Sequence, residues 1–302
     1  MHSTADYLKL HFIVFLFGFT GILGMLVSVP ALDMVFYRTL VAAAGMALLM
    51  MATRGNFHVT TSDLFKLILT GFIVGGHWLT FFLSARVSNV SVSLVGFATA
   101  SLWTAFLEPL VKGYRIRTIE VIFALIVFIG LYIIFASNII YSEGLILGVL
   151  SGLTCAIFSV INSLLVRRME PYTITFYEMA GACLLISIFF PIYQHHWGVG
   201  QTLPMPPMGM DWIYIFLLGG LCTVYAYSAA VELMKKVSVF FFQLTLNLEP
   251  VYGIVMAVLV FGEAEKMNIN FYFGTGVILC SVLLYPWMKR KFITSPTKSD
   301  HP

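Results

Sequence analysis

The chain is a series of long apolar stretches separated by short polar segments, and this pattern limits its fold more than any other feature of the sequence. Each stretch is close to the ~20 residues that an α-helix needs to cross a bilayer. Because the bilayer interior contains no water, backbone groups there must be hydrogen-bonded within helices or closed barrels. Only 10% of the 302 residues are charged, against roughly 25% in soluble domains. The sequence therefore predicts an all-α integral membrane protein.

We expect ten transmembrane helices in this chain. They cover residues 11–29, 34–52, 64–84, 89–111, 119–136, 144–166, 172–193, 211–233, 238–260 and 269–288.

The positions of Lys and Arg predict the orientation of these helices. If the N-terminus is cytoplasmic, fourteen Lys and Arg residues fall on the cytoplasmic side and two, Arg86 and Lys266, on the outside. This excess is the positive-inside signal. It predicts a multi-pass protein of the cell (inner or plasma) membrane with both termini in the cytoplasm. The net charge of +3 then reflects topology, and no nucleic-acid partner is expected.

The two halves of the chain share short motifs in the same order. Residues 36–38 read Phe-Tyr-Arg in the second expected helix, and residues 176–178 read Phe-Tyr-Glu in the seventh. The fourth and ninth expected helices end at Gly113 and Gly262 after similar apolar residues. Because five helices per half is an odd number, the second copy must enter the membrane from the opposite side. The motifs therefore predict inverted repeats, whose halves can rock about a central site.

These repeats define the expected domains. The first five-helix repeat covers residues 1–140 and the second covers residues 141–290, followed by a polar cytoplasmic tail at 291–302.

Glu249 and Pro250 are the most informative polar pair in the apolar stretches, because they lie near the middle of the ninth expected helix. A carboxyl group at that depth is costly and usually lines a cavity. Pro250 cannot donate to the carbonyl of Leu246, so we expect a kink with a free acceptor. Glu249 is our candidate for the proton-coupling residue. The alternative is a carboxyl that only stabilises the kink.

Together, the ten spans in two halves, the 36–38 motif, and the Leu-Glu-Pro of 248–250 followed by Gly262 resemble the drug/metabolite transporter superfamily, in its EamA-type branch. The resemblance covers roughly residues 8–288. It implies a basket-like bundle around a central cavity and the export of amino acids, other metabolites or drugs. Glu108 departs from the pattern of the second half, because it lies near the cytoplasmic end of its helix, where we expect it to be solvated.

Further polar and aromatic residues within the expected helices are candidates for substrate binding. Arg38 could attract an anionic group, pair with an acid or extend to the outer interface. His77 could take part in a proton cycle or be hydrogen-bonded within the bundle. Asn247 could instead cap carbonyls freed by the proline. The candidates are Arg38, His77, Trp78, Trp103, Tyr177, Tyr225, Gln243 and Asn247.

The sequence favours a secondary transporter over an enzyme. It contains no phosphate-binding loop, zinc-protease motif or nucleophile elbow, so we expect no cofactor, no metal and no catalytic residue. The predicted function is proton-coupled export of small organic metabolites. The alternative is a membrane-embedded enzyme or a flippase for lipid-linked substrates, with Glu108, Glu120 and His58 as loose candidates. Ten spans can enclose a pathway in one chain, which leaves a homodimer open.

Overall fold

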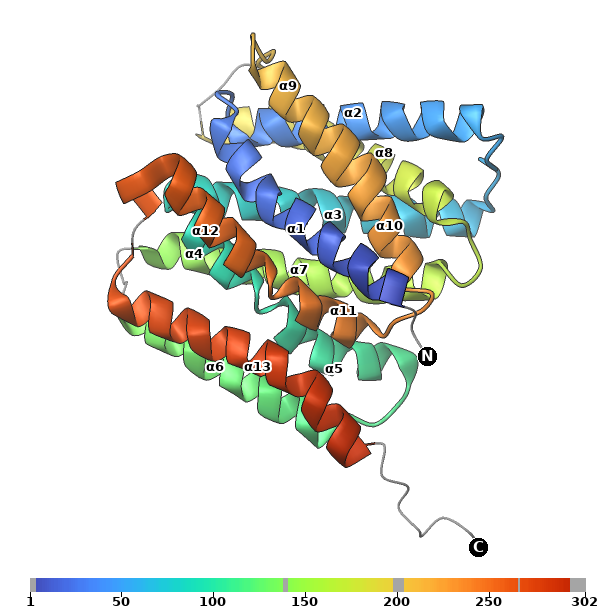
Figure 1. The fold of residues 1–302 in the computed structure, drawn as a ribbon. Helices are drawn as coiled ribbons and strands as arrows, with labels where there is room; N and C mark the ends of the chain where they lie inside the picture. The colour runs from blue at the N-terminus through green and yellow to red at the C-terminus, as the bar shows by residue number, and fades with distance from the viewer. Residues whose placement is uncertain (1–3, 138–140, 198–203, 266, 294–302) are drawn as a thin grey trace, which may run out of the picture.

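The computed structural model describes residues 4–137, 141–197, 204–265 and 267–293, and the chain is predominantly helical throughout these ranges (Figure 1). The helices are α1 (Thr4–Leu26), α2 (Ala31–Ala52), α3 (Thr61–Val87), α4 (Val90–Phe97), α5 (Ala100–Lys112), α6 (Thr118–Ser137), α7 (Ser142–Leu165), α8 (Pro171–Trp197), α9 (Asp211–Phe216), the π-helix η2 (Leu217–Tyr225), α10 (Ala226–Leu233), α11 (Val239–Leu246), α12 (Glu249–Phe261), the 3₁₀-helix η3 (Gly262–Glu265) and α13 (Ile269–Ile293).

Eight of the described helices, counting consecutive segments together, are long and apolar enough to cross a membrane. This confirms the expected integral membrane class. The remaining expected helices, 119–136 and 269–288, correspond to α6 and α13, in which the described apolar stretches, 118–134 and 269–285, are shorter. The total of ten spans therefore stays a prediction, and most of the polar tail at 291–302 lies outside the described residues.

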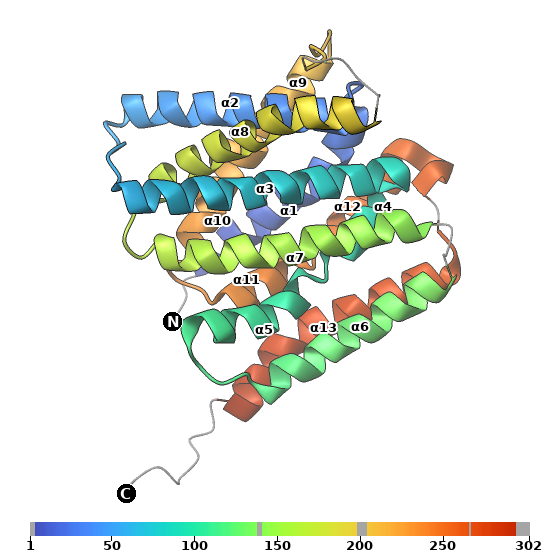
Figure 2. The same cartoon turned by 180° about the vertical axis from the view of Figure 1, so that it is seen from behind.

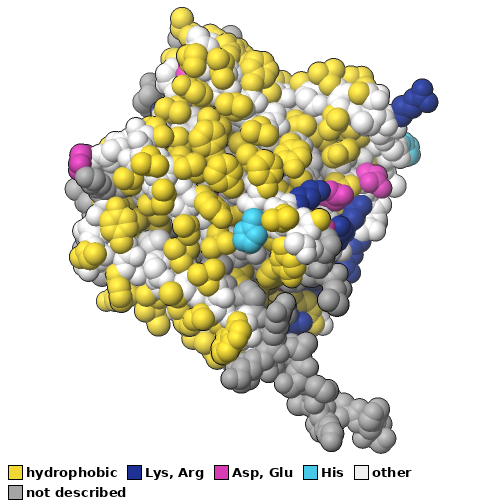
Figure 3. All heavy atoms as spheres, in the orientation of Figure 1, with side chains coloured by type: hydrophobic (Ala, Val, Ile, Leu, Met, Phe, Trp, Pro, Cys, Tyr) yellow, Lys and Arg dark blue, Asp and Glu magenta, His cyan; other side chains and the backbone are white. Residues whose placement is uncertain are grey.

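The helices form a bundle in which α3 lies between α8 and α7, with α2 packed on α8 (Figure 2). On the opposite side α1 packs along α12 and next to α10 (Figure 1). The pair α6 and α13 run together at one edge in both views. Apolar side chains cover most of the face in Figure 3, and Lys and Arg gather at one margin. An apolar belt with charges at its margin is the surface that a bilayer requires.

Glycines let neighbouring helices approach closely at the crossing of α3 and α8. A Cβ atom at Gly71 would lie 2.4 Å from the carbonyl oxygen of Glu178, and one at Gly181 would lie 2.7 Å from that of Ile68. Such contact between backbones is how helices pack where lipid removes the usual hydrophobic driving force. Gly76, on the same helix as Gly71, has nothing within 4 Å of its Cβ position.

Two of the membrane helices are broken near their middle. The first consists of α4 and α5, and the second of α11 and α12. Side chains cap the first segments: Asn89 accepts the N–H of Val92, and Ser238 accepts that of Phe241. The second segments end at glycines with positive φ, 73° at Gly113 and 59° at Gly262. Residues 89, 97 and 113 thus correspond to 238, 246 and 262, a constant offset of 149 positions.

The break between α11 and α12 differs from the kink expected at Pro250. The first segment ends at Leu246, and a new helix begins at Glu249. Pro250 lies in the first turn of that helix, where a backbone N–H has no helical partner in any case. Proline therefore begins a second helix instead of bending a continuous one. The Asn247 side chain donates to the Ser101 hydroxyl at 2.8 Å, and among the described residues it makes no hydrogen bond to a freed carbonyl.

Candidate functional site

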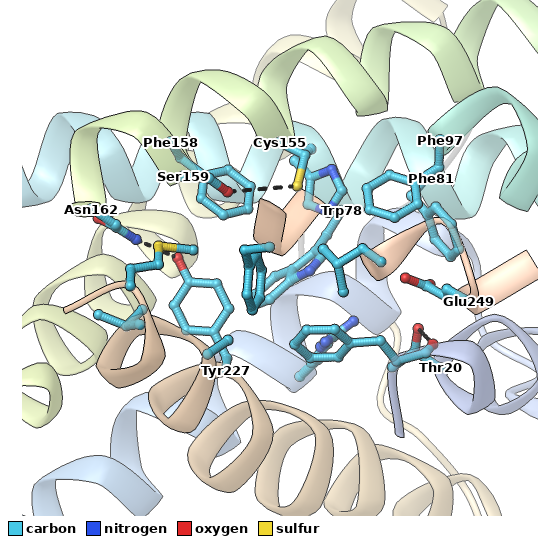
Figure 4. Close-up of a pocket in the computed structure, with 18 residues that line it drawn as sticks. Thr20, Trp78, Phe81, Phe97, Cys155, Phe158, Ser159, Asn162, Tyr227 and Glu249 are labelled. Atoms are coloured by element: carbon cyan, nitrogen blue, oxygen red, sulfur yellow. Dashed lines mark hydrogen bonds between the residues drawn. The ribbon is translucent and has the colours of Figure 1, made fainter. Parts of the chain in front are cut away.

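The two broken helices pass beside an internal cavity in the middle of the bundle (Figure 4). It has about 60 Å³ for the centres of water-sized molecules, and one water needs roughly 10–15 Å³ on this measure. The cavity thus has room for a few waters, and an organic substrate requires it to widen. Its lining is Phe17, Thr20, Arg38, His77, Trp78, Phe81, Phe97, Cys155, Phe158, Ser159, Asn162, Tyr227, Ala230, Val231, Met234, Phe242, Leu246 and Glu249.

Arg38 contributes a buried guanidinium group to this cavity. The residue is 2% exposed, so it does not extend to the interface. Its Nε donates to the Thr223 hydroxyl at 3.1 Å, and its Cζ lies 4.0 Å from the centre of the Trp78 ring. Cation–π contact and this hydrogen bond offset part of the cost of burial. No carboxylate of the described residues lies within ion-pair distance of it, so an anionic ligand could complete its coordination.

The π-helix η2 places Thr223 against Arg38. The Thr223 hydroxyl donates to the carbonyl of Leu218 at 2.7 Å, five residues earlier. A Cβ atom at Gly219 would lie 3.0 Å from the carbonyl oxygen of Arg38, so the glycine lets the two helices approach closely here. Short π-helical segments often occur at functional sites. Nothing in the sequence pattern indicates this one.

Glu249 is the first residue of α12 and is 3% exposed. In Figure 4 its carboxyl group lies near Thr20 at one end of the cavity. It forms no hydrogen bond with the described residues, and Arg38 is the one charged side chain with which it interacts electrostatically. The cavity therefore holds one basic and one acidic group that do not form a direct ion pair.

His77 and Trp78 line the cavity from α3. His77 Nδ1 lies 3.0 Å from the carbonyl oxygen of Ser151 and 2.9 Å from its hydroxyl. Nδ1 either donates to the carbonyl oxygen or accepts from the hydroxyl, according to the tautomer of the ring. The imidazole packs against the Phe97 and Phe158 rings, with centroids 5.5 and 5.4 Å away. These contacts match the alternative of a histidine hydrogen-bonded within the bundle.

Gln243 and Asn247 support the cavity from behind its lining. Gln243 Nε2 donates to the Ser159 hydroxyl at 2.7 Å, and Ser159 lines the cavity. Asn247 connects the break after α11 to α5 through Ser101. Both amides are engaged in positioning neighbours, so direct substrate contact by them stays a prediction.

Three expected aromatic residues lie away from the cavity lining. Tyr225 is 45% exposed and packs against Phe12 on the outer surface. Tyr177 donates from its hydroxyl to the carbonyl of Phe57 at 2.7 Å, which ties α8 to the segment before α3. Trp103 has a buried Nε1 without a partner among the described residues, but it is absent from the lining.

The cavity wall also contains polar residues that sequence reasoning missed. Ser151, Cys155, Ser159 and Asn162 lie on one face of α7, and the last three line the cavity. Their spacing of three and four residues along an apolar helix was the available signal. Behind this wall lies the carboxyl group of Glu178, which accepts hydrogen bonds from Asn162 and Tyr227.

Glu108 and Glu120 are structural residues at their positions. Glu108 was expected to be solvated, and this is wrong, because it is 2% exposed. It accepts the backbone N–H groups of Val239 and Phe240 and pairs with Lys112 at 2.7 Å. Glu120 pairs with Arg117 at 3.2 Å and accepts the Tyr285 hydroxyl.

Polar contacts join neighbouring helices at each of the two ends of the bundle. At one end Asp211 accepts the backbone N–H of Ser28 at 2.9 Å, and Arg86 donates to the carbonyls of residues 24, 27 and 29. At the other end Lys9 pairs with Glu232 at 2.5 Å. The cavity thus lies between two sets of polar contacts.

A helical membrane bundle with broken helices beside a charged cavity is the architecture of a membrane transporter. The EamA-like transporter family model matches residues 7–136 and 142–286. The chain belongs to this family, and this agrees with the expectation that it is not an enzyme.

The fold of this chain also occurs among solved structures. Among solved structures, 27 chains match. One of them, titled "Crystal structure of protein", has a TM-score of 0.70 and 14% sequence identity, and the match covers 96% of this chain and 100% of that one. At this identity the likeness shows the fold alone. No curated protein sequence matches the chain.

Proposed function

We propose that the protein is a secondary active transporter that exports small organic metabolites, such as amino acids, related compounds or drugs, in exchange for protons. The observation that carries this proposal is the arrangement of Arg38 and Glu249, which face one buried cavity from different helices. A buried charged group within a membrane bundle is costly and is generally retained for a ligand or an ion. Glu249 is the proposed proton-coupling residue and Arg38 the proposed anchor for an anionic group.

The rest of the lining suggests how a substrate is held. Phe17, Trp78, Phe81, Phe158 and Tyr227 surround the cavity with aromatic rings. Such rings contribute dispersion and stacking without requiring one defined hydrogen-bond pattern. A substrate with one carboxylate and an apolar or planar body therefore fits the lining better than a strongly hydrated sugar.

The matching breaks in α4–α5 and α11–α12 support alternating access through inverted repeats. Each half contributes one such helix pair, and the capping residue, the break and the terminal glycine lie at corresponding positions in the two pairs. Broken helices beside a binding site allow one half to rock against the other. The polar contacts at the two ends of the bundle would then open in turn, with both termini in the cytoplasm as the Lys and Arg distribution predicts.

The test is labelled-substrate flux in proteoliposomes, with and without a pH gradient, using pools of amino acids and nucleobases. Glu249→Gln removes the titratable group and keeps nearly the same shape. Glu170→Gln is the matched control, because the Glu170 side chain is 77% exposed at the protein surface. We expect gradient-driven accumulation in the native protein and the control, and its loss in Glu249→Gln.

Flux that ignores both the gradient and the substitution would refute proton coupling and leave a facilitator. An absence of flux for every pool would refute small-metabolite transport. The enzyme alternative is not favoured, since Glu108 and Glu120 make hydrogen bonds and ion pairs within the bundle and His58 is exposed.

A further inference from the structure

Glu178 lies directly behind the cavity wall, beside Asn162 and Tyr227, which are at the end far from Glu249 (Figure 4). It belongs to α8 and is 0% exposed. Its Oε2 accepts the Tyr227 hydroxyl at 2.8 Å and Asn162 Nδ2 at 3.2 Å. Asn162 Nδ2 also donates to the Tyr227 hydroxyl oxygen at 3.1 Å. All three side chains therefore form one closed polar cluster.

The cluster has two buried oxygens that receive no hydrogen bond from the described residues. They are Glu178 Oε1 and Asn162 Oδ1. Both donors to the carboxyl are neutral and both act on Oε2. A buried ionised carboxylate without a cation costs several kcal/mol, and two neutral donors on one oxygen offset only part of this cost. Burial, the absence of a cation among the described neighbours and two neutral donors on a single oxygen together favour the neutral form of this carboxyl group.

Charged side chains on the helices around α8 are engaged elsewhere. Asn162 comes from α7 and Tyr227 from α10, while α3 presents its backbone at Gly71. On α2, Arg38 contacts Thr223 and Trp78, and Asp33 accepts the N–H of Met205. On α3, Asp63 forms ion pairs with Arg168 and Lys66, and His77 is hydrogen-bonded to Ser151. Among the described residues, Tyr227 is the titratable group that acts on Glu178.

Glu108 in the same chain is a buried carboxyl group with a cation beside it and donors to both of its oxygens. Its two oxygens receive the ammonium of Lys112 and the N–H groups of Val239 and Phe240. Both oxygens are thus satisfied and a cation balances the charge. Glu178 has neither of these features, although both side chains are almost completely buried.

We propose that Glu178 is a second proton-binding site of this protein, with its proton on Oε1 in the conformation described. When the cavity opens and water enters past Asn162 and Tyr227, the O–H bond at Oε1 breaks and the proton passes to a water molecule. The remaining carboxylate is then stabilised by that water and by the two existing donors. The role of this proton in a cycle rests on the proposed transport function, but the protonation itself does not.

Infrared spectroscopy of the full-length protein in lipid tests the protonation. The C=O stretch of a protonated carboxyl is resolved from the stretches of carboxylates. At neutral pH, Glu178→Gln should remove one protonated-carboxyl band, while Glu170→Gln should leave that band in place. Tyr227→Phe keeps the ring and removes one donor to Oε2, so it should shift the band without removing it. This second variant decides the matter if Glu178→Gln fails to fold.

Loss of carboxylate stretches in Glu178→Gln, instead of the protonated band, would overturn the proposal. So would a Tyr227→Phe spectrum with no shifted band. Flux measurements then address the role in transport: Glu178→Gln should lose stimulation by a pH gradient, and unchanged stimulation would overturn that role. Absence of flux in the native protein would refute the proposed transport function, while the infrared result would still decide the protonation.

Discussion

Replacing Glu108 should loosen the start of α11 and, through it, the break that carries Glu249. The Glu108 side chain is 3% exposed and that of its partner Lys112 14%. Its oxygens also accept the N–H groups of Val239 at 3.3 Å and Phe240 at 2.9 Å. Removing one member of a buried ion pair typically costs ~3–5 kcal/mol. Because Lys112 keeps some contact with water and the amide oxygen still accepts one N–H, Glu108→Gln should cost about 2–4 kcal/mol.

A double-mutant cycle separates the ion pair from the contacts to α11. Lys112→Met removes the ammonium and leaves the Glu108 carboxylate with two backbone donors. In Glu108→Gln/Lys112→Met neither charge remains, so the double variant should lose less stability than the sum of the single variants. The coupling expected for groups in contact is roughly 0.5–3 kcal/mol.

The assay is equilibrium unfolding in detergent micelles, followed by tryptophan fluorescence. Glu170→Gln, at an exposed carboxylate, should stay within about 0.5 kcal/mol of the native protein. Additive losses in the cycle would show that Glu108 and Lys112 do not act as a buried pair. A Glu108→Gln variant as stable as the Glu170 control would refute the reasoning entirely.

Three further outcomes are expected. Gly71→Ala should lower the unfolding free energy by ~1–3 kcal/mol, because the new Cβ would lie 2.4 Å from a backbone oxygen of α8. Gly76→Ala has open space around it and should raise the unfolding free energy by ~0.5–1 kcal/mol. Equal unfolding free energies for the two variants would contradict this contrast in helix packing. Arg38→Lys keeps the positive charge but loses the stacking of the planar guanidinium on Trp78, so the affinity for an anionic substrate should fall about tenfold. An unchanged affinity in a competition assay of substrate flux would contradict the role of stacking. The hydrogen bond and ion pair with Asp6 raise the pKa of Lys236 above its ordinary value of 10.5. The stabilisation of the fold by this ion pair is therefore complete below pH 10.5 and is lost as the pH rises through the raised pKa of Lys236. The difference in unfolding midpoint between the native protein and Lys236→Met should shrink only above pH 10.5.

Apolar length predicted the helices well because lipid leaves the backbone few alternatives. The start and end of most expected helices fall close to those observed, even where a span consists of two segments. The cost of burying charge also predicted that Glu249 would face a cavity, and both Glu249 and Arg38 line one. These inferences need only the sequence, since they depend on the solvent and not on which helices are neighbours.

Contacts between helices could not be predicted in this way. Tyr225 and Tyr227 are two positions apart, so a helix directs them to different sides. Only the packed bundle determines that Tyr227 faces the cavity and that Tyr225 packs against Phe12. The cluster of Glu178 with Asn162 depends on how α7 and α8 meet. Glu108 near a helix end suggested solvation, but the start of α11 covers it.

The matched breaks show how the two halves use one backbone plan for different purposes. The offset of 149 positions places Ala100 opposite Glu249 and Ala257 opposite Glu108. Each broken helix thus carries one buried acid, at a site where the other has alanine. In the first half the acid accepts N–H groups of α11 and holds the bundle together. In the second half it lies at the break without a hydrogen-bond partner among the described residues and faces the cavity. Because Glu108 has hydrogen-bond and ion-pair partners and Glu249 faces the cavity without a hydrogen-bond partner among the described residues, we propose that the first acid serves the structure and the second serves binding.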